Sequence, residues 1–239
     1  MILGARTGAW AKAGDRLPTA RDYVQDGLIA MWDGIENAGW GVHDPNATVW
    51  KDLIVGAELK CLPAFEGGMT FSDTMAEFLK GKIGSVETDR YSVIGLSSAI
   101  SSLESTIQTS IFYTGSGNIG VLPDGGGSAW IGIVNGVRSC SYGNNGWQSI
   151  GGKVVDDWVY LTLNCHLGNV RISDRVANLY STPKTAGSSY SNTNFVSLNL
   201  SSGISKNRFI RIYNRSLSED EEIKNMVIDA ARFNLPDAV

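Results

Sequence analysis

The chain of 239 residues has 20 basic and 24 acidic residues, for a formal net charge of −4. Its basic residues are scattered instead of forming a stripe with interleaved aromatics, which argues against nucleic acid as a partner. No apolar run approaches the roughly 20 residues of a membrane-spanning helix. A chain of this length can form one large β-sandwich domain.

Short apolar runs separated by glycine and serine indicate an all-β domain, because helical periodicity is scarce before Ser218. We expect this domain to span residues 22–239. Residues 1–21 are small and polar, are interrupted by Pro18, and are predicted to form a tail or assembly arm. They lack the long apolar core of a signal peptide. We therefore expect either that the chain is made in the cytoplasm or that the given sequence is a mature form.

The predicted strands have ordinary lengths and are separated by turn residues. In chain order they cover residues 27–33, 48–53, 69–71, 91–96, 106–113, 129–134, 158–165, 169–172, 176–180, 195–200 and 209–213. Glycine-rich segments at 115–120, 124–128 and 143–146 are predicted turns or loops, and a short helical turn is expected at 75–80.

A helix is predicted directly after the last strand. Its apolar residues recur at helical spacing, namely Ile223, Met226, Val227, Ala230 and Phe233. Ser218 and Glu221 have the spacing of a capping box, in which each side chain bonds the other residue's backbone amide. The acidic run 219–222 falls in the first turn, where negative charge favours the helix dipole. Pro236 prevents the helix from continuing.

The run Arg-Ile-Tyr-Asn-Arg-Ser-Leu-Ser-Glu-Asp-Glu at 211–221 resembles the closing segment of laminin G-like domains of the concanavalin-type lectin/glucanase superfamily. Residues 26–33 and 50–53 resemble the start of such domains, especially those of gut bacterial surface proteins and their phages. The strand at 158–163 is similar to another family strand. Just before this run the family usually has Gly and then Ile-Asp-Glu, whereas residues 207–209 of this chain are Asn-Arg-Phe. Because the acidic residue of the family pattern is missing here, no metal-binding or ligand-binding role of it carries over.

The resemblance implies an antiparallel two-sheet jelly-roll sandwich of the concanavalin type with a C-terminal helix. It also implies that the strands near Ile29 and Ile212 lie in the same sheet.

The sequence favours a protein that is not an enzyme. The paired carboxylates of glycosidases in this superfamily, in a pattern like Glu-x-Asp-x-x-Glu, do not occur. The only histidines, His43 and His166, have no zinc-pair spacing, and there is no Gly-x-Ser-x-Gly motif. The three cysteines have no close partner in sequence and are predicted to be buried free thiols, namely Cys61, Cys140 and Cys165.

Two tryptophans in polar loops, Trp40 and Trp147, are candidates for stacking on a sugar, because a loop needs a specific reason to expose an indole. Their candidate polar partners are Asn37, Asp44, Asn144, Asn145 and Gln148. The same indoles could instead plug an end of the sandwich or form an oligomer contact. The strand tryptophans Trp32, Trp50 and Trp158 are predicted to be core, while Trp130 could belong to either class.

Calcium is the one cofactor that the sequence leaves open. Asp33, Asn37 and Asp44 in the first loop are candidate oxygen ligands, together with Glu36 and Asn46. This loop has no spaced ligand code, and Asp and Asn are common in turns for other reasons.

These observations favour a binding or adhesion module that recognises a cell-surface glycan or protein. The resemblance suggests a place on a virion or cell surface, such as a phage fibre or head decoration that associates with itself or other virion proteins through residues 1–21. The first alternative is a purely structural or assembly domain of the particle, and a glycoside hydrolase is the second.

Overall fold

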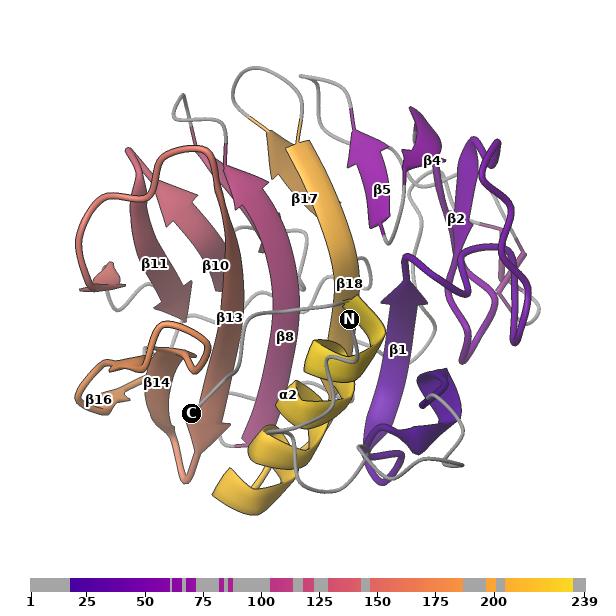
Figure 1. The fold of residues 1–239 in the computed structure, drawn as a ribbon. Helices are drawn as coiled ribbons and strands as arrows, with labels where there is room; N and C mark the ends of the chain where they lie inside the picture. The colour runs from indigo at the N-terminus through magenta and orange to yellow at the C-terminus, as the bar shows by residue number, and fades with distance from the viewer. Residues whose placement is uncertain are drawn as a thin grey trace, which may run out of the picture.

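The computed structural model describes residues 18–60, 62–65, 68–71, 82–83, 86–87, 104–113, 118–122, 129–142, 147–186, 197–200 and 205–233. Within these ranges the strands form two main antiparallel sheets that share one core, and a helix lies across the outer face of the larger sheet (Figure 1). The predicted all-β sandwich with a C-terminal helix is therefore confirmed. The finer jelly-roll connectivity remains a prediction.

The larger sheet has nine strands in the order β15-β14-β13-β8-β18-β5-β4, with β1 paired to β18 and β16 paired to β14. Its strands are β1 (Leu28–Asp33), β4 (Leu62–Phe65), β5 (Gly68–Phe71), β8 (Glu104–Tyr113), β13 (Asp157–His166), β14 (Asn169–Asp174), β15 (Leu179–Tyr180), β16 (Lys184–Thr185) and β18 (Ser205–Tyr213). Ala30 pairs with Ile212, so the first and last strands lie side by side as expected.

The smaller sheet has five strands in the order β12-β11-β10-β9-β17. They are β9 (Ile119–Leu122), β10 (Ala129–Val134), β11 (Val137–Tyr142), β12 (Gln148–Ile150) and β17 (Ser197–Leu200). Two short pairs complete the strands, β2 (Val49–Lys51) with β3 (Glu58–Lys60) and β6 (Lys82–Ile83) with β7 (Val86–Glu87). β9 begins inside the segment 115–120, which was wrongly predicted to be entirely turn.

Alternate residues of the strands fill the space between the sheets. Trp32 and Trp50 are fully buried, as predicted. Trp158 is not part of this core: it is half-buried and lies on the opposite side of β13 from the buried Val159 and Leu161. Cys140 and Cys165 are buried free thiols, as predicted, while Cys61 lies outside the described residues.

The helix α2 (Glu219–Phe233) begins and ends close to where the sequence predicts. The capping box is present, since Glu221 N donates to Ser218 Oγ at 3.3 Å and Ser218 N donates to Glu221 Oε2 at 2.9 Å. The buried face differs from the prediction, because Ile223 is 38% exposed. It consists of Glu222, Asn225, Ile228, Asp229, Ala230 and Phe233.

The polar residues of that face bond the sheet beneath it. Arg211 of β18 forms two hydrogen bonds to Asp229, at 2.8 and 2.5 Å. Asn225 Nδ2 donates to Gln108 Oε1 and to Tyr213 Oη, each at 2.9 Å. A buried polar layer therefore holds the helix on the sheet.

Part of the predicted tail belongs to the folded domain. The short 3-10 helix η1 (Ala20–Asp22) buries Ala20 completely, and Ala20 N donates to Glu36 Oε1 at 2.7 Å. The predicted elements at 75–80, 91–96, 124–128 and 143–146 lie outside the described residues.

Candidate functional site: a groove between two sheet edges

The two sheets meet along one side of the sandwich, where a groove of about 390 Å³ opens between their edge strands. β12 is the terminal strand of the smaller sheet, and β15 and β16 lie at the end of the larger one. We call this cavity the edge groove. It is lined by Gln148, Ser149, Ile150, Gly151, Leu179, Tyr180, Ser181, Thr182 and Lys184.

An ion pair joins the two sheets beside the groove. Arg138 Nε of β11 lies 2.6 Å from Asp174 Oδ2 of β14, and both side chains are almost fully buried. Burial raises the pKa of Asp174, while Arg138 counteracts this effect. Because a buried charge is costly without its partner, this pair fixes the sheet edges relative to each other.

Gly151 lets the chain after β12 approach β15 closely. Its φ of +70° is a backbone conformation that side-chain-bearing residues rarely adopt, and a Cβ at this position would lie 2.5 Å from Leu179 Cδ1. Leu179 thus packs directly against the glycine. Both residues line the groove.

The polar wall of the groove is held in place by its own hydrogen bonds. Gln148 is 6% exposed. Its Oε1 accepts from Ser181 Oγ at 3.2 Å, and Ser181 Oγ in turn accepts from Ile172 N at 3.0 Å. Ser149 Oγ lies 2.8 Å from Ser139 Oγ. The hydroxyl and amide groups that face the groove are therefore positioned before any ligand arrives.

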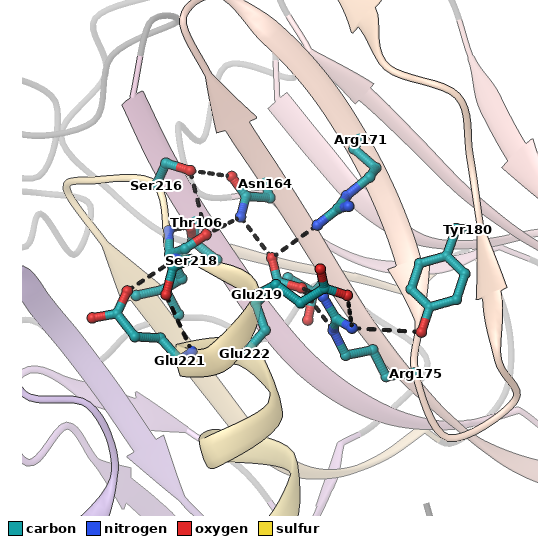
Figure 2. Close-up of polar contacts among 12 residues, drawn as sticks. Thr106, Asn164, Arg171, Arg175, Tyr180, Ser216, Ser218, Glu219, Glu221 and Glu222 are labelled. Atoms are coloured by element: carbon teal, nitrogen blue, oxygen red, sulfur yellow. Dashed lines mark hydrogen bonds and ion pairs between the residues drawn. The ribbon is translucent and has the colours of Figure 1, made fainter. Parts of the chain in front are cut away.

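Two exposed aromatic side chains lie along this edge. Tyr180 is 43% exposed, and Arg175 lies against its ring at 5.4 Å and points a guanidinium nitrogen at its hydroxyl (Figure 2). Trp147, which immediately precedes β12, is 55% exposed and packs edge-to-face on Trp130 at 4.9 Å. Trp130 itself lies so close over Gly120 that a Cβ there would come within 2.3 Å of its indole.

A second groove, the helix-side groove, has a volume of about 460 Å³. It is lined by Asn164, His166, Leu167, Asn169, Arg171, Pro183, Ser216, Leu217 and Glu219. Pro183 belongs to its lining while its chain neighbours Thr182 and Lys184 line the edge groove, so this short segment borders both cavities.

Beside the helix-side groove, the carboxylate of Glu222 is fully buried and multiply bonded (Figure 2). It accepts from Asn164 Nδ2 at 2.6 Å and from Arg175 Nη2 at 2.5 Å, while Arg171 Nη2 lies farther away at 3.4 Å. Ser216 Oγ donates to Asn164 Oδ1 at 2.6 Å. This network anchors the first turn of α2, so Glu222 does more than favour the helix dipole.

The structure places the predicted sugar-binding residues in different parts of the fold. Gln148 lines the edge groove and Trp147 immediately precedes it in the chain, whereas Asn144 and Asn145 are outside the described residues. Trp40 is only half-buried, packs on a separate apolar cluster and has Arg21 stacked on it at 4.3 Å. The two predicted tryptophans therefore do not share one site.

Asn37 and Asp44 brace the first loop. Asn37 Nδ2 donates to Asp44 O and Asn37 Oδ1 accepts from Asp44 N, each at 2.8 Å. Asn37 has no exposed surface, because its amide closes the loop, and it is not among the residues that line the edge groove.

The candidate calcium ligands also have partners within the protein. Asp33 Oδ1 accepts from the amides of Ile35 and Glu36 and from Arg232 Nη2 at 2.7 Å. Asp44 Oδ1 accepts from Asn46 N at 2.9 Å. Among the described residues, no group of three or more His, Cys, Asp or Glu side chains is placed to hold a metal ion.

Sequence reasoning missed Tyr180, Ser181, Thr182 and Lys184, which form the far wall of the edge groove. Tyr180 is the last residue of a predicted strand, the other three follow it, and none of them belongs to a motif. Their relation to Gln148 depends on which sheet edges meet, and no short-range pattern encodes that.

No protein-family model and no curated protein sequence matches this chain. Among solved structures, Trypanosoma rangeli sialidase superposes with a TM-score of 0.57 at 16% identity, over 91% of this chain and 34% of the sialidase. The binding domain of botulinum neurotoxin DC, solved in complex with SialylT, gives a TM-score of 0.52 at 14% identity over 87% of this chain and 52% of that one. The same toxin domain in complex with rat synaptotagmin II gives 0.55 at 12% identity.

The chain spans about a third of the sialidase and about half of the toxin domain. At these identities the likeness shows a shared all-β fold. Among the described residues, no helix is long and apolar enough to cross a membrane.

Proposed function

We propose that this protein is a non-enzymatic binding module that recognises a glycan through the edge groove. The observation that carries the proposal is the exposed ring of Tyr180 beside a wall of fixed hydroxyl and amide groups. Sugars present apolar C–H faces that pack on aromatic rings and hydroxyl groups that need hydrogen-bond partners. The groove offers both, and the exposed Trp147 immediately precedes its strand β12.

The composition of the groove supports binding without hydrolysis. Among the described residues, its lining contains no carboxylate and no histidine, so they supply no pair of groups for acid–base catalysis on a glycosidic bond. Several carboxylates elsewhere are engaged by arginines, as in the pairs Arg211–Asp229 and Arg175–Glu222. The structural neighbours include a toxin binding domain solved with SialylT, which is compatible with glycan recognition on this kind of fold.

Membership of the laminin G-like group and a place on a virion or cell surface belong to the same proposal. They rest on the resemblance of the opening and closing segments. The tail at residues 1–17 would then serve for assembly with other copies or other particle proteins.

The test is a glycan array followed by titration of a hit with three variants. Tyr180→Ala should weaken binding by about 5- to 30-fold, the equivalent of 1–2 kcal/mol for a stacked ring. Tyr180→Phe keeps the ring and should retain most of the affinity. Leu167→Ala, at an exposed residue of the helix-side groove, is the matched control and should bind like the wild type.

A protein ligand is the second candidate, because β12 is a terminal strand and can pair with an added strand. An array without hits, together with capture of an extended peptide that Tyr180→Ala does not affect, would favour that candidate over a glycan.

A further inference from the structure

The strand register places the side chain of Lys184 on the inner face of the larger sheet. Lys184 of β16 pairs with Val170 of β14. Residues that pair directly across two antiparallel strands point to the same face of the sheet. Val170 belongs to the core between the two sheets and is 1% exposed. Lys184 therefore points toward the smaller sheet, and at the sheet edge it is both exposed and part of the lining of the edge groove.

The smaller sheet shows where the ammonium group of Lys184 lies. Cys140 of β11 pairs with Gln148 of β12, which lines the groove. Burial raises the pKa of the Cys140 thiol to about 12, and the positive charge of Lys184 partly counteracts this rise. Because the effect of a charge on a titrating group decreases with distance, the ammonium lies near Cys140. It is therefore held between the edges of the two sheets.

The edge groove has an excess of positive charge. Among the described residues, its lining includes no Asp or Glu, and no ion pair involves Lys184. The carboxylate of Asp174, beside the groove, is almost fully buried and is already paired with Arg138. Arg138 Nη1 would lie 3.5 Å from a Cβ at Gly151, so this second cation lies close to the groove lining. An anion that enters the groove meets the unpaired charge of Lys184.

A lysine on the inner face of a sheet edge has two physical explanations. It can keep the strands of other copies from pairing with the edge, because such pairing would bury its charge. Alternatively, it can bind an anionic ligand. The first role needs a cation but no positioned polar groups around it, whereas Lys184 shares its groove with the hydrogen-bonded pair Gln148 and Ser181. The surroundings therefore favour a ligand.

We propose that Lys184 makes the edge groove selective for glycans that carry an anionic substituent, either a carboxylate or a sulfate. The ammonium donates hydrogen bonds to the anionic oxygens and supplies the opposite charge. A lysine is a compact charge with three rotatable donors, so it accepts both kinds of anion. This inference rests on the proposed glycan-binding function and names the class of glycan.

The test is a glycan array that carries neutral glycans beside their anionic forms, such as cellobiose beside cellobiouronate and lactose beside lactose sulfate, followed by titration of the hits. For each pair that the wild type binds, we expect the anionic member to bind about fivefold more tightly, the upper end for an ion pair open to solvent. Raising the salt concentration should reduce this preference, because salt screens the charges. The uronate and sulfate pairs show which of the two anions is preferred.

Three variants test whether Lys184 is responsible. Lys184→Met removes the charge but keeps a long side chain, so the two members of a pair should bind alike within this variant. Lys184→Arg keeps the charge and should keep the preference. Lys224→Met, at an exposed lysine of α2 outside the groove lining, removes the same charge elsewhere and should keep the wild-type preference. Thermal melts establish that the variants are folded, and the comparison of paired glycans on the wild type needs none of them.

Three other outcomes overturn the inference in different ways. Equal binding of neutral and anionic members by the wild type would remove the charge preference and leave the proposed glycan binding intact. A preference that persists in Lys184→Met would assign the anion to another residue. Equal binding by the wild type, together with self-association of Lys184→Met in sedimentation velocity, would assign Lys184 to keeping sheet edges of separate copies apart. An array with no binding at all would overturn the proposed function itself.

Discussion

Single buried charges decide how the helix meets the sheet. Arg211 is 1% exposed, and its guanidinium bonds both oxygens of Asp229 and Gln108 Oε1. Tyr23 Oη donates to the same carboxylate at 2.7 Å. These hydrogen bonds and the ion pair compensate for the cost of burying the charges of Arg211 and Asp229.

Asp229→Ala should therefore lower the free energy of unfolding by about 3–5 kcal/mol, because it leaves Arg211 buried and unpaired. The double variant Arg211→Met/Asp229→Leu should recover at least half of this loss, since it replaces the pair with apolar groups. Urea denaturation of the three proteins measures both effects. A stability of Asp229→Ala equal to that of the wild type would show that the pair does not hold the helix.

A second residue-scale effect concerns pH. Asp52 is 3% exposed and accepts hydrogen bonds from the amides of Met31, Val55 and Ile54. Burial raises its pKa from 3.8 to about 6, although these hydrogen bonds oppose the shift. Between these values the folded protein binds more protons than the unfolded chain. The contribution of Asp52 to stability is therefore complete below about pH 4 and is lost as the pH rises through about 6.

Relative to Asp52→Asn, the wild type should lose up to about 3 kcal/mol of its free energy of unfolding between pH 4 and pH 7. The measurement is chemical denaturation of both proteins across this range. Asp156→Asn, at an exposed turn residue, is the control and should follow the wild-type pH profile. A constant difference between wild type and Asp52→Asn at all pH values would contradict the raised pKa.

At the scale of elements, the sequence predicts the boundaries of α2 better than its buried face. Ser218 and Glu221 act within one turn, so a local pattern suffices to predict the cap. The buried face depends on the sheet beneath, which presents Arg211 and Gln108 and therefore selects Asp229 and Asn225. Hydrophobic periodicity cannot reveal such long-range polar pairs.

The same contrast applies to the candidate site. The exposure of Trp147 could be predicted from a single loop, because an indole in a polar segment is a local signal. Tyr180 could not, since its relation to Gln148 arises only where the sheets meet. The loop-closing bonds of Asn37 could not be predicted either, because a buried loop residue and a ligand contact look alike in sequence.

Substitutions in α2 should separate its two faces. Phe233→Ala should cost about 3 kcal/mol or more, because its ring is buried against Phe209 at 5.8 Å. Ser218→Ala should cost about 1 kcal/mol through loss of the cap. Ile223→Ala should cost under about 0.5 kcal/mol, because this residue is 38% exposed and lies outside the buried face of the helix. Thermal melts of the three variants measure which of them loses the most stability. A loss of stability in Ile223→Ala as large as that in Phe233→Ala would contradict the observed orientation of the helix.

At the scale of the whole molecule, the sandwich separates two grooves. The edge groove lies between the ends of the two sheets, and the helix-side groove lies beside the start of α2. The inter-sheet pair Arg138–Asp174 and the polar layer under α2 tie these surfaces to one framework. A ligand at the edge groove therefore meets a preformed site, which lowers the ordering cost of binding.

The central claim is that the edge groove binds a glycan, and backbone-amide NMR with a neutral glycan selected on the array tests it most directly. We expect saturable shifts concentrated at residues 147–151 and 179–184, with the loop around Trp40 unchanged. Shifts confined to that loop or to the helix-side groove, or no shifts at saturating glycan, would contradict the claim.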